Sequence, residues 1–591
     1  MAGTFTSASM SRDRNVGPKA SQAGWPVRPP ERGERPHDHR RVCGQTASMF
    51  SIESDPGAAR GPRRWPALLL TALAAGASSA AAQSPASPDV PPPTQEAEPE
   101  REEPPGYLSP TEFHRIGSGV VLNAPEATPG LTIVAPINSR SIHLLDLDGE
   151  IVHTWETEYA PGEWCYLLDD GNLLRSARED DDPHFRGGGI GGRLQLLAPD
   201  GSVRWTHRIA DENRHAHHDI EPLPNGNLLV ILWERKSAEQ AIARGREPKH
   251  VGAAGLWPDA VLELKPTLPE GAEVVWEWHA WDHLVQDFDP GAAGYGDVPA
   301  NPGLIDVNGD HRRDRPMTEA ERKQEQELHE QLAALGYIGG APADDDDEED
   351  LSFLDRSGDM MHTNALAYLP EHDLIVLSTP EYGELWVIDH STTSEEAAGS
   401  TGGRFGRGGE ILWRWGNPRQ YGRGGDDDQH LFYQHNPTWL PSEDPNELRL
   451  LVFNNRAHGD GEDRYSTVEE LAIPFDPERG FPLPTSEPFG PAEPSWTYQD
   501  RGNFYSSFIS GAQRLASGNT LICSGAAGRI FEVTADGRVV WDYYGTLGGD
   551  VEPPDHAGKA PAQSIFRAVR IPNEHPGIQA ILRFARGNAD R

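Results

Sequence analysis

The amino-acid sequence predicts an all-β protein that folds as a six-bladed β-propeller. Three observations support this prediction: a short motif recurs along the chain, a tryptophan-bearing strand follows most of its copies, and a strand missing near the start is present at the end. The chain of 591 residues also contains 62 glycines and 52 prolines. This content is typical of a protein with many turns, and it disfavours long helical bundles.

The recurring motif is a leucine followed three residues later by Gly-Asn and then by apolar residues. It begins at Leu168, Leu223 and Leu515, with weaker copies at Leu369 and Leu440. Glycine and asparagine adopt positive φ at low cost, so the motif predicts tight turns between antiparallel strands. Self-similarity at this scale indicates an architecture built from repeated units.

A second predicted hairpin ends most units in a strand that carries tryptophan. These residues are Trp155, Trp205, Trp276, Trp413, Trp496 and Trp541. Four short strands that end in a bulky aromatic side chain, able to pack between neighbouring sheets, are what a propeller blade requires. Residues 118–157 lack an opening strand, whereas residues 565–572 have the missing apolar pattern. We therefore expect the C-terminal strand to complete the first blade. The alternative, a β-sandwich or barrel, does not explain six tryptophan-ended units.

The segment before the repeats has the composition of targeting and linker sequence. We interpret residues 1–59 as disordered or as the result of a start codon assigned too far upstream, residues 60–83 as a signal peptide, and residues 84–106 as a Pro/Glu-rich linker. The apolar run at residues 65–77 is shorter than the ~20 residues needed to span a bilayer. We therefore expect a periplasmic or secreted protein without stable membrane insertion.

The propeller is expected to occupy residues 107–591 and to carry one long insertion at about residues 286–358. The insertion contains a capping box near Pro316, leucines with helical spacing and a run of acidic residues. We expect it to be partly helical, and acidic runs usually form solvated surface.

The chain has 52 basic and 92 acidic side chains, a net charge of −40. This balance disfavours nucleic acid as a partner, because phosphate binding needs clustered cations. The three cysteines, Cys43, Cys165 and Cys523, are too few for a disulfide scaffold, and no Cys/His spacing indicates a zinc site. Residues 306–310 resemble the start of a calcium loop, but His311 stands where that loop needs glycine. We expect neither a metal nor a cofactor.

Polar residues recur at one position of the repeat. In the unit that contains Leu223-Pro224, this position is six residues before the proline, and the other units are counted in the same way. In successive units this position holds Glu163, His218, Asn364, His435 and Ser510, with Phe566 in the closing strand. His362, two residues before Asn364, shares its strand face. The same offset predicts the same face and height in every blade, so these side chains are expected to converge at one mouth of the central channel. A lone histidine there is more often a structural residue, but three in one frame favour a functional site.

Several motifs carry a more specific signal. They are His217-His218-Asp219-Ile220, His362-Thr363-Asn364, Trp386-Val-Ile-Asp-His-Ser-Thr, Arg414-Trp415-Gly416-Asn417-Pro418, and Gln434-His435 ahead of Trp439-Leu-Pro. In these motifs, and over most of residues 107–580, the chain resembles the bacterial arylsulfate sulfotransferase family, PAPS-independent enzymes with a six-bladed propeller. The resemblance implies a phenolic sulfate ester as donor, a phenol as acceptor and no cofactor. It also implies that His435 takes the sulfuryl group covalently and that His218 or His217, with His362 and Asn364, holds the sulfate oxygens.

The residue types suit this chemistry on independent grounds. A neutral imidazole, with an ordinary pKa of ~6.5, is a competent nucleophile near neutral pH. A sulfohistidine intermediate would split one difficult displacement into two easier ones and give ping-pong kinetics. The remaining histidine and asparagine donors would stabilise the negative charge on the sulfuryl oxygens.

The chain departs from the family pattern at two positions. The arginine expected after the H-x-N motif is replaced near Pro380 and Glu381, so Arg456 and Arg567 become the candidate sulfate-binding cations. The aspartate expected after the nucleophile is replaced by Asn436. Ser510 and Gln434 are further candidate substrate-binding residues. Two other hypotheses stay open: a catalytically silent or diverged propeller that binds an anionic or aromatic ligand in the same channel, and a metal-dependent hydrolase built on the histidines.

Overall fold

The computed structural model describes residues 119–179, 184–185, 187–311, 358–457, 464–545, 547–549 and 563–589, and every structural statement below refers to these residues. The expected start region, signal peptide and linker lie outside them. So do the capping box near Pro316 and the acidic run of the insertion.

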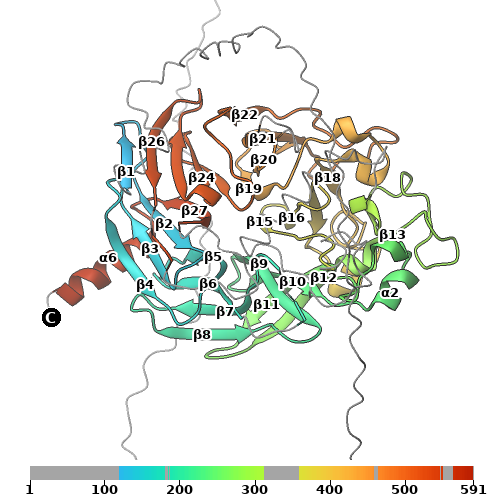
Figure 1. Ribbon diagram of the computed structural model, residues 1–591, viewed down its shortest axis with the longest axis horizontal. Helices are drawn as coiled ribbons and strands as arrows, with labels where there is room; N and C mark the ends of the chain where they lie inside the picture. Colours follow the sequence, from blue (N-terminus) through green and yellow to red (C-terminus); the bar gives the residue numbers. More distant parts are fainter. Residues whose placement is uncertain are drawn as a thin grey trace, which may run out of the picture. The chain divides into compact units, whose positions relative to one another are not determined.

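The described chain forms six antiparallel sheets arranged in a ring around a central axis (Figure 1). From the axis outward, blade 1 contains β27 (Ile565–Ile571), β2 (Leu131–Pro136), β3 (Ser141–Leu145) and β4 (Ile151–Glu156). Blade 2 contains β5 (Pro161–Leu167), β6 (Leu173–Arg178), β7 (Gly192–Leu197) and β8 (Val203–Arg208). Blade 3 contains β9 (Arg214–Pro222), β10 (Leu228–Glu234), β11 (Asp259–Pro266) and β12 (Ala272–His279).

The remaining blades follow the same order. Blade 4 contains β15 (Ala365–Leu369), β16 (Leu374–Thr379), β17 (Glu384–Asp389) and β18 (Trp413–Trp415). Blade 5 contains β19 (His435–Leu440), β20 (Glu447–Asn454), β21 (Thr467–Pro474) and β22 (Trp496–Gln499). Blade 6 contains β23 (Gly511–Arg514), β24 (Thr520–Ser524), β25 (Arg529–Val533) and β26 (Val539–Tyr544). The predicted six-bladed propeller is therefore confirmed.

Short elements lie outside the blades. They are the parallel pair β13 (Leu284–Val285) and β14 (Ile305–Asp306), the helices α2 (Ala238–Ala243), α5 (Ser394–Ala397) and α6 (Pro576–Ala589), and the 3-10 turns η1 (Pro248–His250), η2 (Ala280–His283), η3 (Gly309–His311), η5 (Pro418–Tyr421), η6 (Asp426–Asp428) and η7 (Gly525–Ala527). None of the described helices is both long enough and apolar enough to cross a membrane.

Both ends of the chain take part in closing the ring. The C-terminal strand β27 pairs with β2 as the innermost strand of blade 1, with Leu131 opposite Ile571. The apolar pattern of residues 565–572 predicted this pairing. The sequence did not predict the role of β1 (Gly119–Asn123), which pairs with β26 and adds a fifth, outermost strand to blade 6. Residues 118–157 thus contribute to two blades.

The repeated tryptophans connect neighbouring blades through their indole N–H groups. Trp205 donates to the carbonyl of Gly271 (2.7 Å), Trp276 to Oγ1 of Thr392 (3.1 Å), Trp413 to Gly490 (2.8 Å), Trp496 to Ala535 (3.0 Å) and Trp541 to Leu147 (2.8 Å). Each bond joins the outer strand of one blade to the next blade. At the sixth interface, the indole N–H of Trp155 is buried without a partner among the described residues. The apolar core lies between the sheets, as in the cluster shared by blades 2 and 3.

Candidate active site

The axis is surrounded by the innermost strands β27, β5, β9, β15, β19 and β23, each in contact with its neighbours. Near the start of these strands the backbone is irregular. The pairing of β5, β9, β19 and β27 shifts register at this height, which is the mark of a β-bulge. Positive φ angles occur at Glu163 (99°), His218 (51°), His362 (52°), Asn436 (51°) and Ser510 (98°). Bulges re-aim side chains, and strained non-glycine residues concentrate at functional sites.

Three of the predicted histidines gather at this end of the axis. The ring centroids of His218 and His362 are 4.5 Å apart, in an edge-to-face arrangement. The rings of His218 and His435 each lie 6.2 Å from the ring of Phe566 on β27. All three imidazoles are buried. Residues from blades 1, 3 and 5, and the segment entering blade 4, therefore meet in one cluster.

Two carbonyl oxygens fix the tautomer of His435. Its Nδ1 lies 2.9 Å from the carbonyl oxygen of Tyr433 and 2.8 Å from Oδ1 of Asn455. The amide nitrogen of Asn455 donates to the carbonyls of Ser506 and Ile509, both at 2.8 Å, so the amide oxygen must face the imidazole. Both neighbours of Nδ1 are acceptors, which places the proton on Nδ1 and the lone pair on Nε2. Burial lowers the pKa of His435 to about 3, so the ring is neutral.

His362 has the opposite electrostatic setting. Its Nδ1 lies 2.6 Å from Oδ2 of Asp359, and its backbone N–H donates to the other carboxylate oxygen at 3.1 Å. The indole N–H of Trp233 donates to that same oxygen (3.1 Å) and fixes the carboxylate. Burial by itself would lower the pKa of His362, but the charge and hydrogen bond of Asp359 outweigh it and raise the pKa. Asp359 thus favours the protonated form of His362, whereas burial favours the neutral forms of His218 and His435.

His217 and His218 are joined to each other and to the surrounding scaffold. Their Nδ1 atoms lie 2.8 Å apart, and Nε2 of His217 lies 3.3 Å from Oδ1 of Asp259. The ring of His217 stacks on Trp233 at 4.1 Å between centroids. Burial, followed by the charge of neighbouring cationic groups, lowers the pKa of His218 well below its ordinary value. A Cβ at Gly189 would lie 2.1 Å from Nε2 of His218, so only glycine lets the two segments approach this closely.

Asn364 and Gln434 form hydrogen bonds that hold the segment leading into β19, the strand that begins at His435. The amide nitrogen of Asn364 and the hydroxyl of Ser378 donate to the carbonyl of Gln434, at 2.8 and 3.1 Å. The side-chain nitrogen of Gln434 donates to the carbonyl of Glu384 at 2.7 Å. The amide oxygens of Asn364 and Gln434 are buried without partners among the described residues. These two residues connect blade 4 to His435.

Two carboxyl groups lie near His362. Burial raises the pKa of Glu163 to about 7, and the charges of Arg178 and His362 oppose this rise. Burial also raises the pKa of Glu381 to about 7, and the hydroxyl of Tyr433 donates to this carboxyl at 3.1 Å. Glu381 lies in the segment where the family arginine is replaced. Both carboxyls are partly neutral at pH 7, so the cluster is less negative than its composition suggests.

Arg567 is the cation that influences the histidine cluster directly. It is buried on β27, and its Nη2 donates to Oδ2 of Asp219 at 2.8 Å. Its charge contributes, after burial, to the lowered pKa values of both His218 and His435. Its Nε is buried without a partner among the described residues. Nη2 is therefore paired, and the neighbouring Nε remains to donate.

Arg456 and Ser510 take part mainly in packing. The guanidinium of Arg456 stacks 3.8 Å from the ring centroid of Tyr433, and its Nε donates to the carbonyl of Ser507 at 3.2 Å. The hydroxyl of Ser510 donates to Ser506 at 2.8 Å and accepts from the backbone N–H of Gly525 at 3.0 Å. Arg456 therefore orders Tyr433, whose carbonyl holds the His435 ring.

The calcium-like loop uses its own side chains internally. Arg246 donates to both carboxylate oxygens of Asp310, and Oδ1 of Asn308 accepts from the backbone N–H of Glu247 at 2.9 Å. Across the part of the chain that the structure describes, no group of three or more His, Cys, Asp and Glu side chains is placed to hold a metal ion. The two described cysteines, Cys165 and Cys523, are free and buried.

A comparison with protein families settles the family of the chain. The model of the family described as arylsulfotransferase (ASST) matches residues 201–541, more than half of the sequence. The chain belongs to the arylsulfotransferase (ASST) family. Membership supports aryl sulfotransfer as the general activity and small-molecule aryl sulfates and phenols as substrates. The resemblance stated from the motifs is thereby confirmed. Comparison with curated proteins gives no match.

Solved structures with a related fold are distant. A protein of unknown function from Bacteroides caccae is 12% identical with a TM-score of 0.33, covering 75% of this chain and 98% of that chain. The periplasmic gluconolactonase PpgL of Pseudomonas aeruginosa is 11% identical with a TM-score of 0.32, covering 75% of this chain and 100% of that chain. No conclusion about this chain rests on these likenesses.

The sequence analysis missed residues that act on the histidines from neighbouring segments. They are Asn455 beside His435, Asp359 beside His362, Asp259 beside His217, and Gly189 against His218. Asn455 directly precedes Arg456, which the sequence indicated as a candidate cation. The glycines at 187–189 and 191–192 are typical of a segment whose backbone approaches another closely. Nothing in the periodicity of the chain pointed to Asp359.

Proposed function

We propose that this chain is an exported aryl sulfotransferase that carries the sulfuryl group on His435. The observation that carries the proposal is the tautomer of His435: two carbonyl oxygens hold the proton on Nδ1 and leave the Nε2 lone pair as the nucleophile. The low pKa keeps this ring neutral throughout the physiological range. A neutral, oriented imidazole is what attack on sulfur needs.

The first half-reaction transfers the sulfuryl group to the enzyme. Nε2 of His435 attacks the sulfur of the aryl sulfate, so that an N–S bond forms as the S–O bond to the aryl group breaks. The departing phenolate takes a proton from the cationic His362, which Asp359 holds in place. The sulfuryl oxygens are stabilised by Arg567 and by the second N–H of the Asn364 amide.

The second half-reaction runs the same steps in reverse with a different phenol. The acceptor phenol returns a proton to His362, its oxygen attacks the sulfur, and the N–S bond to His435 breaks. Atoms and charge balance over the cycle, and no cofactor is consumed. Above pH 7 the ionised Glu163 and Glu381 oppose binding of the anionic donor.

The test uses the purified mature chain with 4-nitrophenyl sulfate as donor and phenol as acceptor. We expect nitrophenol release in the wild type, loss of release to the uncatalysed level in His435→Ala, and a radiolabelled sulfuryl group bound to the wild-type protein alone. His153→Ala is the matched control, because this half-buried histidine lies on the outer strand β4. Nitrophenol release at the wild-type rate by His435→Ala would refute the assignment.

A second candidate function is a propeller that binds an anionic or aromatic ligand without turnover. It is motivated by the replacement of the family arginine near Pro380. This alternative predicts thermal stabilisation by aryl sulfates with no nitrophenol release, and the labelled histidine adduct would exclude it.

Export is the remaining part of the proposal. It is supported by the basic-apolar pattern of residues 60–83 followed by small residues. Fractionation of expressing cells should place the protein, shortened at its N-terminus, in the periplasm or the medium; unprocessed protein in the cytoplasm would contradict this.

A further inference from the structure

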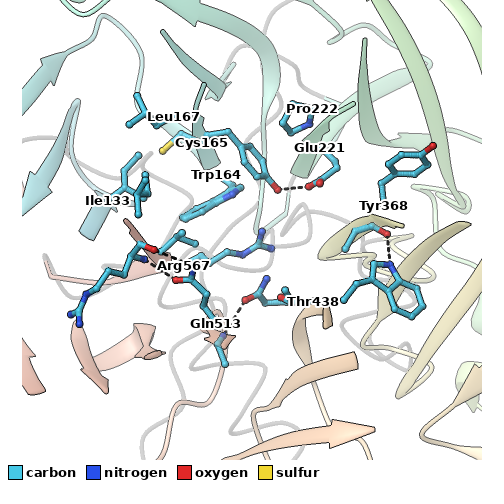
Figure 2. Close-up of a pocket in the computed structure, with 18 of the residues that line it drawn as sticks. Ile133, Trp164, Cys165, Leu167, Glu221, Pro222, Tyr368, Thr438, Gln513 and Arg567 are labelled. Atoms are coloured by element: carbon cyan, nitrogen blue, oxygen red, sulfur yellow. Dashed lines mark hydrogen bonds between the residues drawn. The ribbon is translucent and has the colours of Figure 1, made fainter. Parts of the chain in front are cut away.

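A cavity of about 460 Å³ is lined by the innermost strands, from Asn436 and Arg567 beside the histidine cluster to the ends of these strands. The histidines occupy the starts of the innermost strands, whereas the cavity is lined by residues at the strand ends, including Leu167, Pro222, Tyr368, Gln513 and Ile571. Figure 2 shows these ends arranged around one space. The three histidines do not line it. The cavity therefore adjoins the histidine cluster but is lined by other side chains.

The walls of this cavity are mainly aromatic. Trp164, Tyr166, Tyr368 and Trp439 come from blades 2, 4 and 5, and Figure 2 labels Trp164 and Tyr368 among them. Bonds to the protein fix three of these rings. The hydroxyl of Tyr166 donates to Oε2 of Glu221 at 2.5 Å, that of Tyr368 to Asp373 at 2.8 Å, and the indole of Trp439 to the carbonyl of Ala367 at 3.1 Å. These bonds pre-organise flat apolar surfaces that suit a planar ring.

Three lining side chains, Trp164, Arg567 and Arg570, carry N–H donors that no described residue satisfies. Nε1 of Trp164 and Nε of Arg567 are both buried, and neither has a hydrogen-bond partner. Both side chains are more than nine-tenths buried, with exposed fractions of 3% and 4%. Buried donors are normally paired, so each marks a place for an oxygen atom of a ligand. The two donors lie close together, because the guanidinium carbon of Arg567 is 5.0 Å from the centre of the Trp164 rings.

The cavity carries little net charge at neutral pH. Arg567 is paired with Asp219, and Arg570 forms an ion pair with Glu532. Burial raises the pKa of Glu221 to about 8; Asp219 raises it further, whereas the Tyr166 hydroxyl and Arg567 oppose the rise. An anionic ligand would have no unpaired cation to neutralise it here, and its desolvation would cost free energy. A neutral ligand meets no such penalty.

We propose that this cavity binds an uncharged, hydroxylated aromatic molecule at a site separate from the histidine cluster. Its ring lies between the aromatic walls, and its oxygen accepts from Trp164 and Arg567. The volume is within the range of small-molecule sites, about 300–1,000 Å³, and admits a ligand of two rings. Arg567 also serves in the proposed sulfotransfer, so the binding test uses His435→Ala, which removes the proposed nucleophile and leaves Arg567 in place.

The experiment compares a neutral and an anionic probe that share one ring system. The neutral probe is 4-(hydroxymethyl)benzophenone, and the anionic probe is benzophenone-4-sulfonate, which contains no transferable sulfuryl ester. Calorimetric titration of the full chain should show saturable binding of the alcohol, equal in the wild type and His435→Ala. Thr438→Trp, which fills the cavity from β19, should weaken that binding at least tenfold. The sulfonate should not displace the alcohol.

Photochemical cross-linking gives a second readout that needs no variant. On irradiation, the benzophenone alcohol should label residues at the strand ends, such as Leu167, Pro222 or Val569. Labelling of the histidine cluster, displacement by the sulfonate, or alcohol binding unchanged in Thr438→Trp would overturn the proposal. Absence of saturable binding would overturn it as well. Sulfotransfer assays on the same samples report separately on the function proposed for His435.

Discussion

The two ends of the propeller axis are built from the same six strands but differ in backbone and in charge. At the histidine end, inner strands bulge, several non-glycine residues have positive φ, and three imidazoles are buried together. At the cavity end, the innermost strands run in regular register, and the charged side chains form ion pairs. Among the innermost strands, the irregular backbone is confined to the end where the chemistry is proposed.

This difference shows how a repeated fold acquires a unique site. Regular strands repeat the same face in every blade, which is sufficient to enclose a cavity. A bulge breaks this alternation, so that two consecutive residues can both reach groups near the axis. His218 joins the imidazole cluster, and Asp219 pairs with Arg567. Arg567 lies at the boundary, since it lines the cavity and also acts electrostatically on the histidines.

At the histidine end, the largest loss of activity is expected when the hydrogen bond between Asn455 and Nδ1 of His435 is removed. In Asn455→Leu, Nδ1 of His435 keeps only the Tyr433 carbonyl, and the carbonyls of Ser506 and Ile509 lose their donor. The proton can then move to Nε2 and block the nucleophile. We expect kcat to fall about 100-fold, equivalent to ~2.7 kcal/mol of barrier, with a smaller change in KM.

The control for that substitution is Asn519→Leu. Asn519 is also a nearly buried amide, and its nitrogen donates to Glu532 (2.7 Å) and to the carbonyl of Glu126 (3.0 Å) in blade 6. It should lower the melting temperature and leave kcat per folded molecule unchanged. Equal losses of kcat in the two variants would show that Asn455 acts on stability alone.

Lowering the pKa of His362 should reduce activity less, because in the proposed mechanism His362 protonates the leaving group and does not form the bond to sulfur. Asp359→Asn removes the carboxylate that raises the pKa of His362, so the ring loses its proton at a lower pH. Activity that needs the protonated ring is lost as pH rises through its pKa. The alkaline limb of the kcat/KM profile should therefore move to lower pH, with a loss of about tenfold at pH 7.

A matched Asp–His pair away from the axis serves as the control. Asp373 lies 2.7 Å from Nδ1 of His390, whose pKa is raised to about 9 by this bond and by Glu263 against the effect of burial. Asp373→Asn should leave the pH profile of sulfotransfer in place. A profile that moves equally in both variants would remove His362 from the proposed mechanism.

Much of the fold followed from the sequence because propeller blades repeat their signals. The Gly-Asn turns and the tryptophans predicted units of four strands, and the apolar pattern at 565–572 predicted the closing strand. The fifth strand of blade 6 was not predicted, because β1 adds to an outer edge and carries no repeat signal. Its pairing depends only on the free edge of β26.

The site was less accessible to sequence reasoning, for a physical reason. The period-two argument put His218, Asn364 and His435 at equivalent heights, but it assumes regular strands, and the bulges change which side chains face the axis. The groups that set proton positions, Asn455 and Asp359, come from segments outside the inner strands. Such partners depend on tertiary packing, which periodicity does not encode.

The smallest expected effect concerns stability, and it compares carboxyls at the two ends. Burial raises the pKa of Glu221 at the cavity to about 8 and that of Glu163 at the histidines to about 7. A carboxyl whose folded-state pKa is raised contributes stability below its unfolded value, near 4.5, and loses it as pH rises through the folded value. Scanning calorimetry from acid to alkaline pH should therefore show the melting temperature falling less in Glu221→Gln than in the wild type, by on the order of a few degrees. In Glu163→Gln the melting temperature should also fall less than in the wild type, and this difference should reach its full size about one pH unit lower than in Glu221→Gln. Melting curves that stay parallel to the wild type at every pH would show that neither carboxyl is buried in its neutral form.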